Sequence, residues 1–212
     1  MKMDRTRRTI VTAVAALPFA ALPFAARAQS ASFSEVKPPQ PVEGGGIEVL
    51  EFFWYGCPHC YSLEPVIEPW SKKLAPDVRF RRVPAVFNDR WALDAAIFYS
   101  FEALGVLEKV HRPFFDAIHR DRLRSDNKEA RDQWLERNGV DVKKFEETLK
   151  SFGVQSKVKR AAQQTVAYKI DGTPAMAVQG RYTVSAEQGR SQQGMLQAVD
   201  GLVDMVRKQN QK

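Results

Sequence analysis

Cysteine and histidine are scarce in this sequence, and repeats are absent from it. Only two of the 212 residues are cysteines and three are histidines. A zinc site built on Cys-x-x-Cys usually needs a second pair of ligands, and the sequence contains no second cysteine pair. It also shows no repeat and no low-complexity tract. These absences argue against a zinc site and a repeat architecture, and they leave the two cysteines to be explained.

A hydrophobic run long enough to cross a membrane is also missing. The apolar stretch Thr9–Phe24 contains two prolines and is shorter than the roughly 20 residues that a membrane span requires. It precedes Ala26-Arg27-Ala28, which has the small-x-small form of a signal-peptidase site, and it follows a basic start: Lys2, Arg5, Arg7 and Arg8. The sequence therefore predicts an exported protein with a signal peptide over residues 1–28, cleaved after Ala28. The Sec and twin-arginine routes both stay open.

A large excess of positive charge is absent once that segment is removed. Residues 1–28 hold five Lys or Arg residues and one acid, so the remaining 184 residues carry 27 basic and 24 acidic side chains. This small excess requires no nucleic-acid partner. The remaining length accommodates one ample core or a domain with an insertion. Two basic clusters are interpreted as solvated surface: Arg79, Arg81 and Arg82, and Lys157, Lys159 and Arg160.

The two cysteines lie in the motif Cys57-Pro58-His59-Cys60, just after the apolar run Ile47–Trp54. A disulfide between them can open and close without unfolding the rest of the chain. As a purely structural link, a loop of about four residues contributes only roughly 2 kcal/mol on the chain-entropy model. His59 lies inside the turn, and the other two histidines are far away in the sequence. The motif therefore favours redox chemistry over a structural link or a zinc site.

The residues around the motif predict a strand followed by a helix. The apolar run is typical of a central strand that is covered on both faces. The helix then begins near Cys57, and Pro58 fits its first turn because an N–H has no partner there. Unpaired N–H groups and the helix dipole favour the Cys57 thiolate, and His59 can add a donor or a positive charge. Cys57 is therefore the candidate nucleophile, exposed and acidic, and Cys60 is the candidate resolving thiol.

Two glutamates are candidates for proton transfer near the cysteines. Glu51 interrupts the apolar strand, and a buried carboxylate must either pair with a basic group or keep its proton with a raised pKa. A salt bridge to one of the arginines at 79–82 on the neighbouring strand and a functional role are both open. Glu64 follows Cys60 by four residues on the same helix face. It either exchanges protons with Cys60 or lies exposed without a role, and the sequence favours the exposed position.

Three segments give the chain a family resemblance: Glu51-Phe52-Phe53, Cys57 to Tyr61, and Gly172-Thr173-Pro174-Ala175. With them it resembles the DsbA family of periplasmic dithiol oxidases over essentially the whole chain after residue 28. The resemblance implies a thioredoxin-like α/β fold with an inserted α-helical domain. It also implies that Thr173-Pro174 is a cis peptide packed beside the disulfide. The family often carries a lysine near the position of Arg82 and a histidine near that of Pro84, and this chain differs at both.

The insertion is also visible in the hydrophobic pattern. Residues 88–160 contain no convincing strand and are predicted to form the helical domain, between thioredoxin-like segments at 29–87 and 161–212. Four amphipathic helices are expected in it: Trp91 to Leu104, Leu107 to His119, Asp126 to Asn138 and Val142 to Phe152. Their start and stop signals are Ser125, Gly139 and Gly153.

Four further residues of this region are interpreted as surface or packing residues: Trp91, His111, His119 and Trp134. A long helix from about residue 155 to residue 167 is expected to return the chain to the sheet. A hairpin around Gln179-Gly180 and a closing helix over 192–208 complete the predicted fold.

The leading functional hypothesis is a dithiol oxidase that introduces disulfide bonds into exported proteins. The Cys57–Cys60 disulfide passes to a client through a mixed disulfide, and no other cofactor or metal is needed. The expected clients are unfolded exported polypeptides, bound through the backbone around Thr173 and Pro174. The resemblance implies a periplasmic monomer that is reoxidised by a DsbB-type quinone reductase of the inner membrane. A reductase or isomerase with the same fold is the alternative, followed by a zinc- or peptide-binding module.

Overall fold

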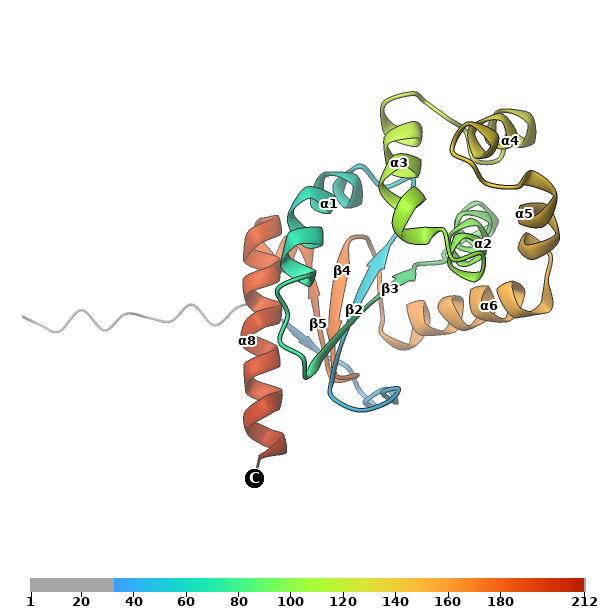
Figure 1. Ribbon diagram of the computed structural model, residues 1–212. Coiled ribbons are helices and arrows are strands. Elements are labelled where there is room, and N and C mark those ends of the chain that lie inside the picture. Colours follow the sequence, from blue (N-terminus) through green and yellow to red (C-terminus); the bar gives the residue numbers. More distant parts are fainter. Residues whose placement is uncertain (1–32, 212) are drawn as a thin grey trace, which may run out of the picture. The chain divides into compact units, whose positions relative to one another are not determined.

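A five-stranded mixed sheet lies at the centre of the fold (Figure 1). The computed structural model describes residues 33–211, and the predicted signal peptide with its cleavage site lies outside them. β2 (Ile47–Phe53) is parallel to β3 (Val78–Pro84) and antiparallel to β4 (Ala175–Val178). β5 (Tyr182–Ser185) and the short β1 (Ser34–Glu35) extend the sheet in the order β1-β5-β4-β2-β3. The predicted central strand is confirmed.

Helices cover both faces of β2, and every residue of this strand is buried. Leu50 and Phe52 belong to one apolar cluster, together with residues of α2 (Asp89–Ala103) and α6 (Phe152–Ala167). Val49 belongs to a second cluster, with residues of α1 (Pro58–Ser71) and α8 (Gln192–Asn210). Because successive side chains of a strand point to opposite faces, Glu51 shares the face of Val49. The strand therefore directs this carboxyl toward α1, the helix that begins beside the motif.

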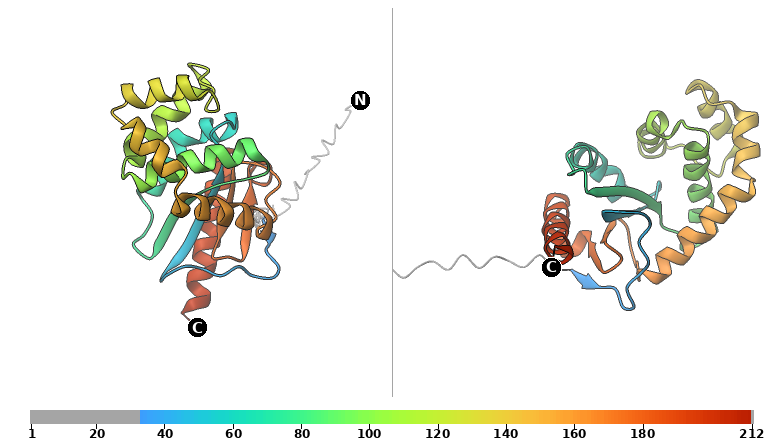
Figure 2. Two further views of the ribbon diagram at one scale, coloured as in Figure 1. Left: turned by 90° about the vertical axis from the view of Figure 1, so that its right-hand side faces the viewer. Right: turned by 60° about the horizontal axis from the view of Figure 1, so that its bottom comes forward.

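Helices α2 to α6 follow one another between β3 and β4, and they lie on the side of the sheet away from α8 (Figures 1 and 2). The additional bounds are α3 (Leu107–His119), α4 (Lys128–Arg137) and α5 (Val142–Leu149). All the helices predicted in this region are therefore present, and α3 has the predicted ends. Within residues 33–211, no helix is both long and apolar enough to span a membrane.

Two of the predicted helix signals are wrong. Gly153 was expected to end a helix, but it lies in the first turn of α6, whose N-cap is Ser151. The Ser151 hydroxyl accepts a hydrogen bond from the Val154 N–H, and this cap starts α6 three residues earlier than the sequence indicated. Ser125 does not cap α4 either, because Asn127 does. α6 runs through Arg160 without a break, and the division into domains at 160 and 161 stays a prediction.

The β4–β5 hairpin turns at Gln179 and Gly180, as predicted, and both residues have a positive φ (51° and 63°). The Gly180 carbonyl accepts a hydrogen bond from the Gln40 N–H at 2.8 Å. This contact holds the segment before β2 against the hairpin. A Cβ at Gly180 would overlap the backbone of Gln40. The turn therefore needs glycine for both its conformation and its close packing.

Replacing Gly180 with alanine should lower the free energy of unfolding by about 2 kcal/mol, because the new Cβ meets the Gln40 backbone and the left-handed conformation is strained. Gly201, inside α8, is the matched control, because a Cβ there meets no atom. G201A should stabilise the protein by about 0.5–1 kcal/mol through its helix propensity. Urea unfolding of both variants tests this, and a G180A protein as stable as the parent would contradict it.

Candidate active site

Cys57 is the N-cap residue of α1, as the sequence predicted. Its backbone is extended (φ −84°, ψ 116°), and its sulfur accepts a hydrogen bond from the Cys60 N–H at 3.3 Å. Pro58 is the first residue of the helix, where a missing N–H has no cost. The sulfur of Cys57 therefore occupies the position in which serine or aspartate oxygens usually cap helices.

The loop before β4 lies against this sulfur. The Thr173-Pro174 peptide is cis, as the resemblance implied. When Cys57 is protonated, its thiol donates a hydrogen bond to the carbonyl oxygen of Thr173 at 3.2 Å. Cys57 is only 6% exposed, and Cys60 is completely buried. The expectation of an exposed Cys57 is therefore wrong, because this loop packs directly against it.

The two thiols differ sharply in acidity. The pKa of Cys57 is lowered to about 5, chiefly because the Cys60 thiol donates a hydrogen bond to the Cys57 sulfur, with the backbone N–H groups of Cys60 and His59 adding to the effect. Burial raises the pKa of Cys60 well above its ordinary value, and the neighbouring Cys57 raises it further. At neutral pH the reduced site therefore holds a thiolate on Cys57 and a thiol on Cys60.

The His59 side chain is exposed. Its contribution to the low pKa of Cys57 is made through its backbone N–H. Its carbonyl accepts a hydrogen bond from the Ser62 hydroxyl at 3.0 Å. A role for the imidazole ring of His59 therefore stays a prediction.

Glu51 pairs with Arg82, one of the arginines that the sequence offered. The two residues face each other in the β2–β3 register, and Nε of Arg82 lies 3.1 Å from Oε2 of Glu51. Nη2 of Arg82 also donates to Oε2 of Glu64 at 3.3 Å. Two interpretations of the sequence are wrong here. Glu64 was expected to be exposed but is only 2% exposed, and Arg82 was interpreted as solvated surface although its side chain is only 17% exposed. One guanidinium thus lies between two buried carboxyl groups.

The two carboxyl groups respond differently to this environment. Burial raises the pKa of Glu51 to about 8, although the charge of Arg82 opposes this. Burial raises the pKa of Glu64 too, but the neighbouring His111 ring and the charge of Arg82 outweigh burial and leave this pKa below the ordinary value. Glu51 therefore holds a proton at neutral pH, and Glu64 is ionised.

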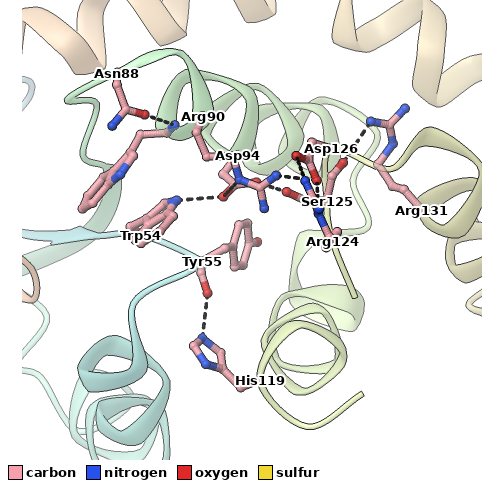
Figure 3. Close-up of polar contacts among 11 residues, drawn as sticks. Trp54, Tyr55, Asn88, Arg90, Asp94, His119, Arg124, Ser125, Asp126 and Arg131 are labelled. Carbon is pink, nitrogen blue, oxygen red and sulfur yellow. Dashed lines mark hydrogen bonds and ion pairs between the residues drawn. The ribbon is translucent and has the colours of Figure 1, made fainter. Parts of the chain in front are cut away.

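The sequence did not identify His111 and His119 as neighbours of the motif. Nδ1 of His111 lies 2.9 Å from the Tyr55 hydroxyl, and Nε2 lies 3.4 Å from Oε1 of Glu64. Nε2 of His119 lies 2.8 Å from the backbone oxygen of Tyr55 (Figure 3). Phe115 stands midway between the two histidines, so the three share one face of α3. That shared face was the available signal, and α3 turns it toward the residues just before Cys57.

Trp54, three residues before Cys57 in the chain, is held by contacts with α2. Its indole N–H donates to Oδ2 of Asp94 at 2.7 Å (Figure 3). Its ring stacks on Trp91 with 4.2 Å between centroids. A Cβ at Gly56 would overlap the indole. Asp94 is buried and also accepts a hydrogen bond from the Ser125 hydroxyl. The sequence missed Asp94 because a single acid in an apolar helix gives no indication of its partners.

The described residues contain no group of three or more His, Cys, Asp or Glu side chains that could hold a metal ion. What the site does bring together is an acidic thiol, a buried thiol and a carboxyl group that retains a proton. This combination suits thiol–disulfide exchange, in which one sulfur must leave easily as an anion and the other must be protonated.

Comparison with known proteins places this arrangement in a family. The family model described as a DSBA-like thioredoxin domain matches residues 81–199. A thiol:disulfide interchange protein DsbA from Burkholderia cepacia is 42% identical over 184 residues, which cover 86% of this chain and 87% of the relative. The protein of the same name from Bordetella parapertussis is 41% identical over 212 residues, which cover 97% of this chain and 100% of the relative.

Solved structures agree with these sequence relatives. The crystal structure of Pseudomonas aeruginosa DsbA is 38% identical, with a TM-score of 0.81, over 85% of this chain and 94% of that chain. The structure of the oxidoreductase DsbA from Xylella fastidiosa is 30% identical, with a TM-score of 0.77, and the match covers 83% of this chain and 95% of that chain. The predicted thioredoxin-like fold with inserted helices is confirmed.

Removing the Cys60 thiol should raise the pKa of Cys57, because the largest contribution to its low value is the hydrogen bond from that thiol. We expect a midpoint of about 5 for the reduced parent protein, and a rise of about one unit in C60A. C60S, which keeps an O–H donor at the same place, is the matched control and should stay near the parent value. Thiolate absorbance in the ultraviolet, followed against pH, measures all three. Equal midpoints in C60A and the parent would refute this cause.

Proposed function

The chain belongs to the DsbA family and is a thiol:disulfide oxidoreductase, and from this premise we propose that it donates its Cys57–Cys60 disulfide to exported polypeptides. The observation that supports the direction of transfer is the contrast between the two sulfurs. Because the Cys57 thiolate is stabilised, the reduced form of the enzyme is favoured and its disulfide is readily given away.

The proposed reaction has two displacement steps. A substrate thiolate attacks the Cys57 sulfur, the S–S bond to Cys60 breaks, and a mixed disulfide forms. The substrate's second thiolate then attacks the substrate sulfur of the mixed disulfide and expels Cys57 as a thiolate. The substrate loses two electrons and two protons and gains a disulfide. The enzyme takes up the two electrons and keeps one proton on Cys60, and the other proton passes to solvent.

Glu51 is the proposed proton donor to Cys60 in the first step. Cys60 is completely buried, so its thiolate cannot take a proton directly from bulk water. Glu51 carries a proton at neutral pH. In its ionised form, its charge raises the pKa of Cys60. Once it has given up the proton, the Glu51 carboxylate faces Arg82 at 3.1 Å. Glu64 contributes to this relay through Arg82.

Substrate binding is proposed for the loop that contains Thr173 and Pro174. Its backbone lies against the nucleophilic sulfur, where an extended peptide could pair with it. Phe87 is 44% exposed and packs against Trp91, which stacks on Trp54. These rings offer an apolar surface near the site. Recognition of this kind depends little on the side chains of the client, which suits an enzyme with many substrates.

The setting of the reaction is proposed from the family and the N-terminal segment. We infer export to the periplasm with cleavage after Ala28, action as a monomer, and reoxidation by a DsbB-type quinone reductase of the inner membrane. Pro58 and His59 are proposed to tune the thiolate from within the motif, and the redox-active disulfide is the only cofactor that the reaction requires.

Equilibrium with glutathione tests the direction of transfer. The protein lacking residues 1–28 should have a potential well above the value of about −270 mV that is typical of thioredoxin. It should oxidise a reduced, unfolded protein that has two thiols. C60A charged with glutathione as a mixed disulfide at Cys57 should exchange the glutathione for a single-thiol variant of this client and release free glutathione, and C57A should form no such adduct. A potential near that of thioredoxin would instead favour the reductase.

Replacing Glu51 with glutamine should slow the attack of a small thiol on the oxidised enzyme by about 100-fold, because Cys60 loses its proton donor. The effect depends on pH. Glu51 is protonated below its pKa of about 8, so the ratio of parent to E51Q rates should be largest there and should fall as the pH rises through that value. Taking the ratio cancels the ionisation of the attacking thiol. Stopped-flow measurement of both proteins gives the profile, and a ratio that does not change with pH would remove Glu51 from the mechanism.

A further inference from the structure

A row of buried polar groups continues from Glu51 beyond the carboxyls already described. Arg82 lies next to Glu51 and Glu64, and His111 lies next to Glu64 on the far side. The row ends at the Tyr55 hydroxyl, 2.9 Å from Nδ1 of His111. It therefore joins Glu51, the proposed proton donor to Cys60, to a histidine on α3.

The direction of the hydrogen bonds in this row follows from the acidity of Tyr55. Burial raises the pKa of the Tyr55 hydroxyl well above its ordinary value, so this group stays protonated and donates to Nδ1 of His111. Nδ1 then accepts, and in a neutral ring the proton must be on Nε2, which lies 3.4 Å from Oε1 of Glu64. His111 therefore presents an N–H to Glu64.

Aromatic rings keep His111 neutral. The rings of Phe53, Phe98 and Phe115 pack around it with centroid distances of 5.4, 5.8 and 5.2 Å. Burial in this environment lowers the pKa of His111 below its ordinary value, although Glu64 opposes the shift.

Charged groups face His111 from several of the surrounding elements. Glu64 comes from α1, Arg82 from β3, and Glu108 from the helix of His111 itself. Tyr55 faces it from the turn before α1. α2 contributes the uncharged ring of Phe98.

The charges of the row do not balance without a proton. Glu51 and Glu64 together carry two negative charges when ionised, and Arg82 supplies one positive charge. The row therefore holds one additional proton, which could be on Glu51 or on His111. With His111 kept neutral, the proton stays on Glu51, at the end of the row that acts on Cys60.

We propose that His111 is a positioning residue for disulfide exchange: its N–H shares Glu64 with Arg82, and this leaves the guanidinium free to stabilise the Glu51 carboxylate. The inference rests on the proposed role of Glu51 as proton donor. Without the N–H of His111, Glu64 depends on Arg82 alone, the guanidinium is drawn away from Glu51, and Glu51 gives up its proton less readily.

The test is the titration of the Glu51 carboxyl, followed by carbon-13 NMR and assigned by comparison with E51Q. In H111F the midpoint should rise by about one unit from the parent value, which is about 8. In H111Q, which keeps an N–H that can reach Glu64, at least half of that rise should be reversed. H119Q is the matched control, because His119 lies on the same face of α3 but contacts the Tyr55 backbone instead of Glu64. Its Glu51 midpoint should match that of the parent.

A double-mutant comparison tests the route. If His111 acts through Glu64, then H111F should not move the Glu51 midpoint further in an E64Q background. An unchanged midpoint in H111F, a rise that H111Q fails to reverse, or an equal rise in the E64Q background would each overturn the proposal. If H111F does not fold, a midpoint in H111Q more than half a unit above that of the parent would also overturn it. E51Q kinetics report separately on the proton-donor role, so the failure of either idea can be recognised.

Discussion

The start of α1 imposes opposite environments on two sulfurs that are three residues apart. At the N-cap position, the Cys57 sulfur receives hydrogen bonds that favour its anion, while one turn further the Cys60 sulfur is completely enclosed. Every other feature of the site follows from this contrast. In the proposed mechanism the buried sulfur takes its proton from Glu51, and the acidic sulfur meets its client beside the loop of Thr173 and Pro174.

Burying an ionisable carboxyl in the central strand is costly, and the fold limits that cost by sharing a single guanidinium. Arg82 cannot neutralise Glu51 and Glu64 fully at the same time, so one proton is retained among buried groups. A strand of purely apolar residues would be simpler to pack. In the proposed mechanism this retained proton is the one that passes to Cys60, so stability is given up for chemistry.

The sequence predicted the features that local patterns determine. The central strand, the helix at the motif, the ends of α3 and the β4–β5 turn all follow from apolar periodicity or from turn residues. The missed features depend on which surfaces meet. Glu64 was expected to be exposed, because a helix face does not indicate what packs on it, and the same holds for Asp94 and His111. β1 is too short, at two residues, to leave any pattern.

α6 gives the helical segment a rigid connection to the sheet. Its 16 residues form one helix that passes the expected domain boundary and ends eight residues before β4 begins. Thr165, near the end of α6, accepts a hydrogen bond from the backbone of Val86 just after β3. The end of β3 is thereby tied directly to α6, and β4 follows α6 after the loop of residues 168–174. Hinged opening of the helical segment within α6 would require this helix to bend, and its hydrogen bond to Val86 resists such a motion.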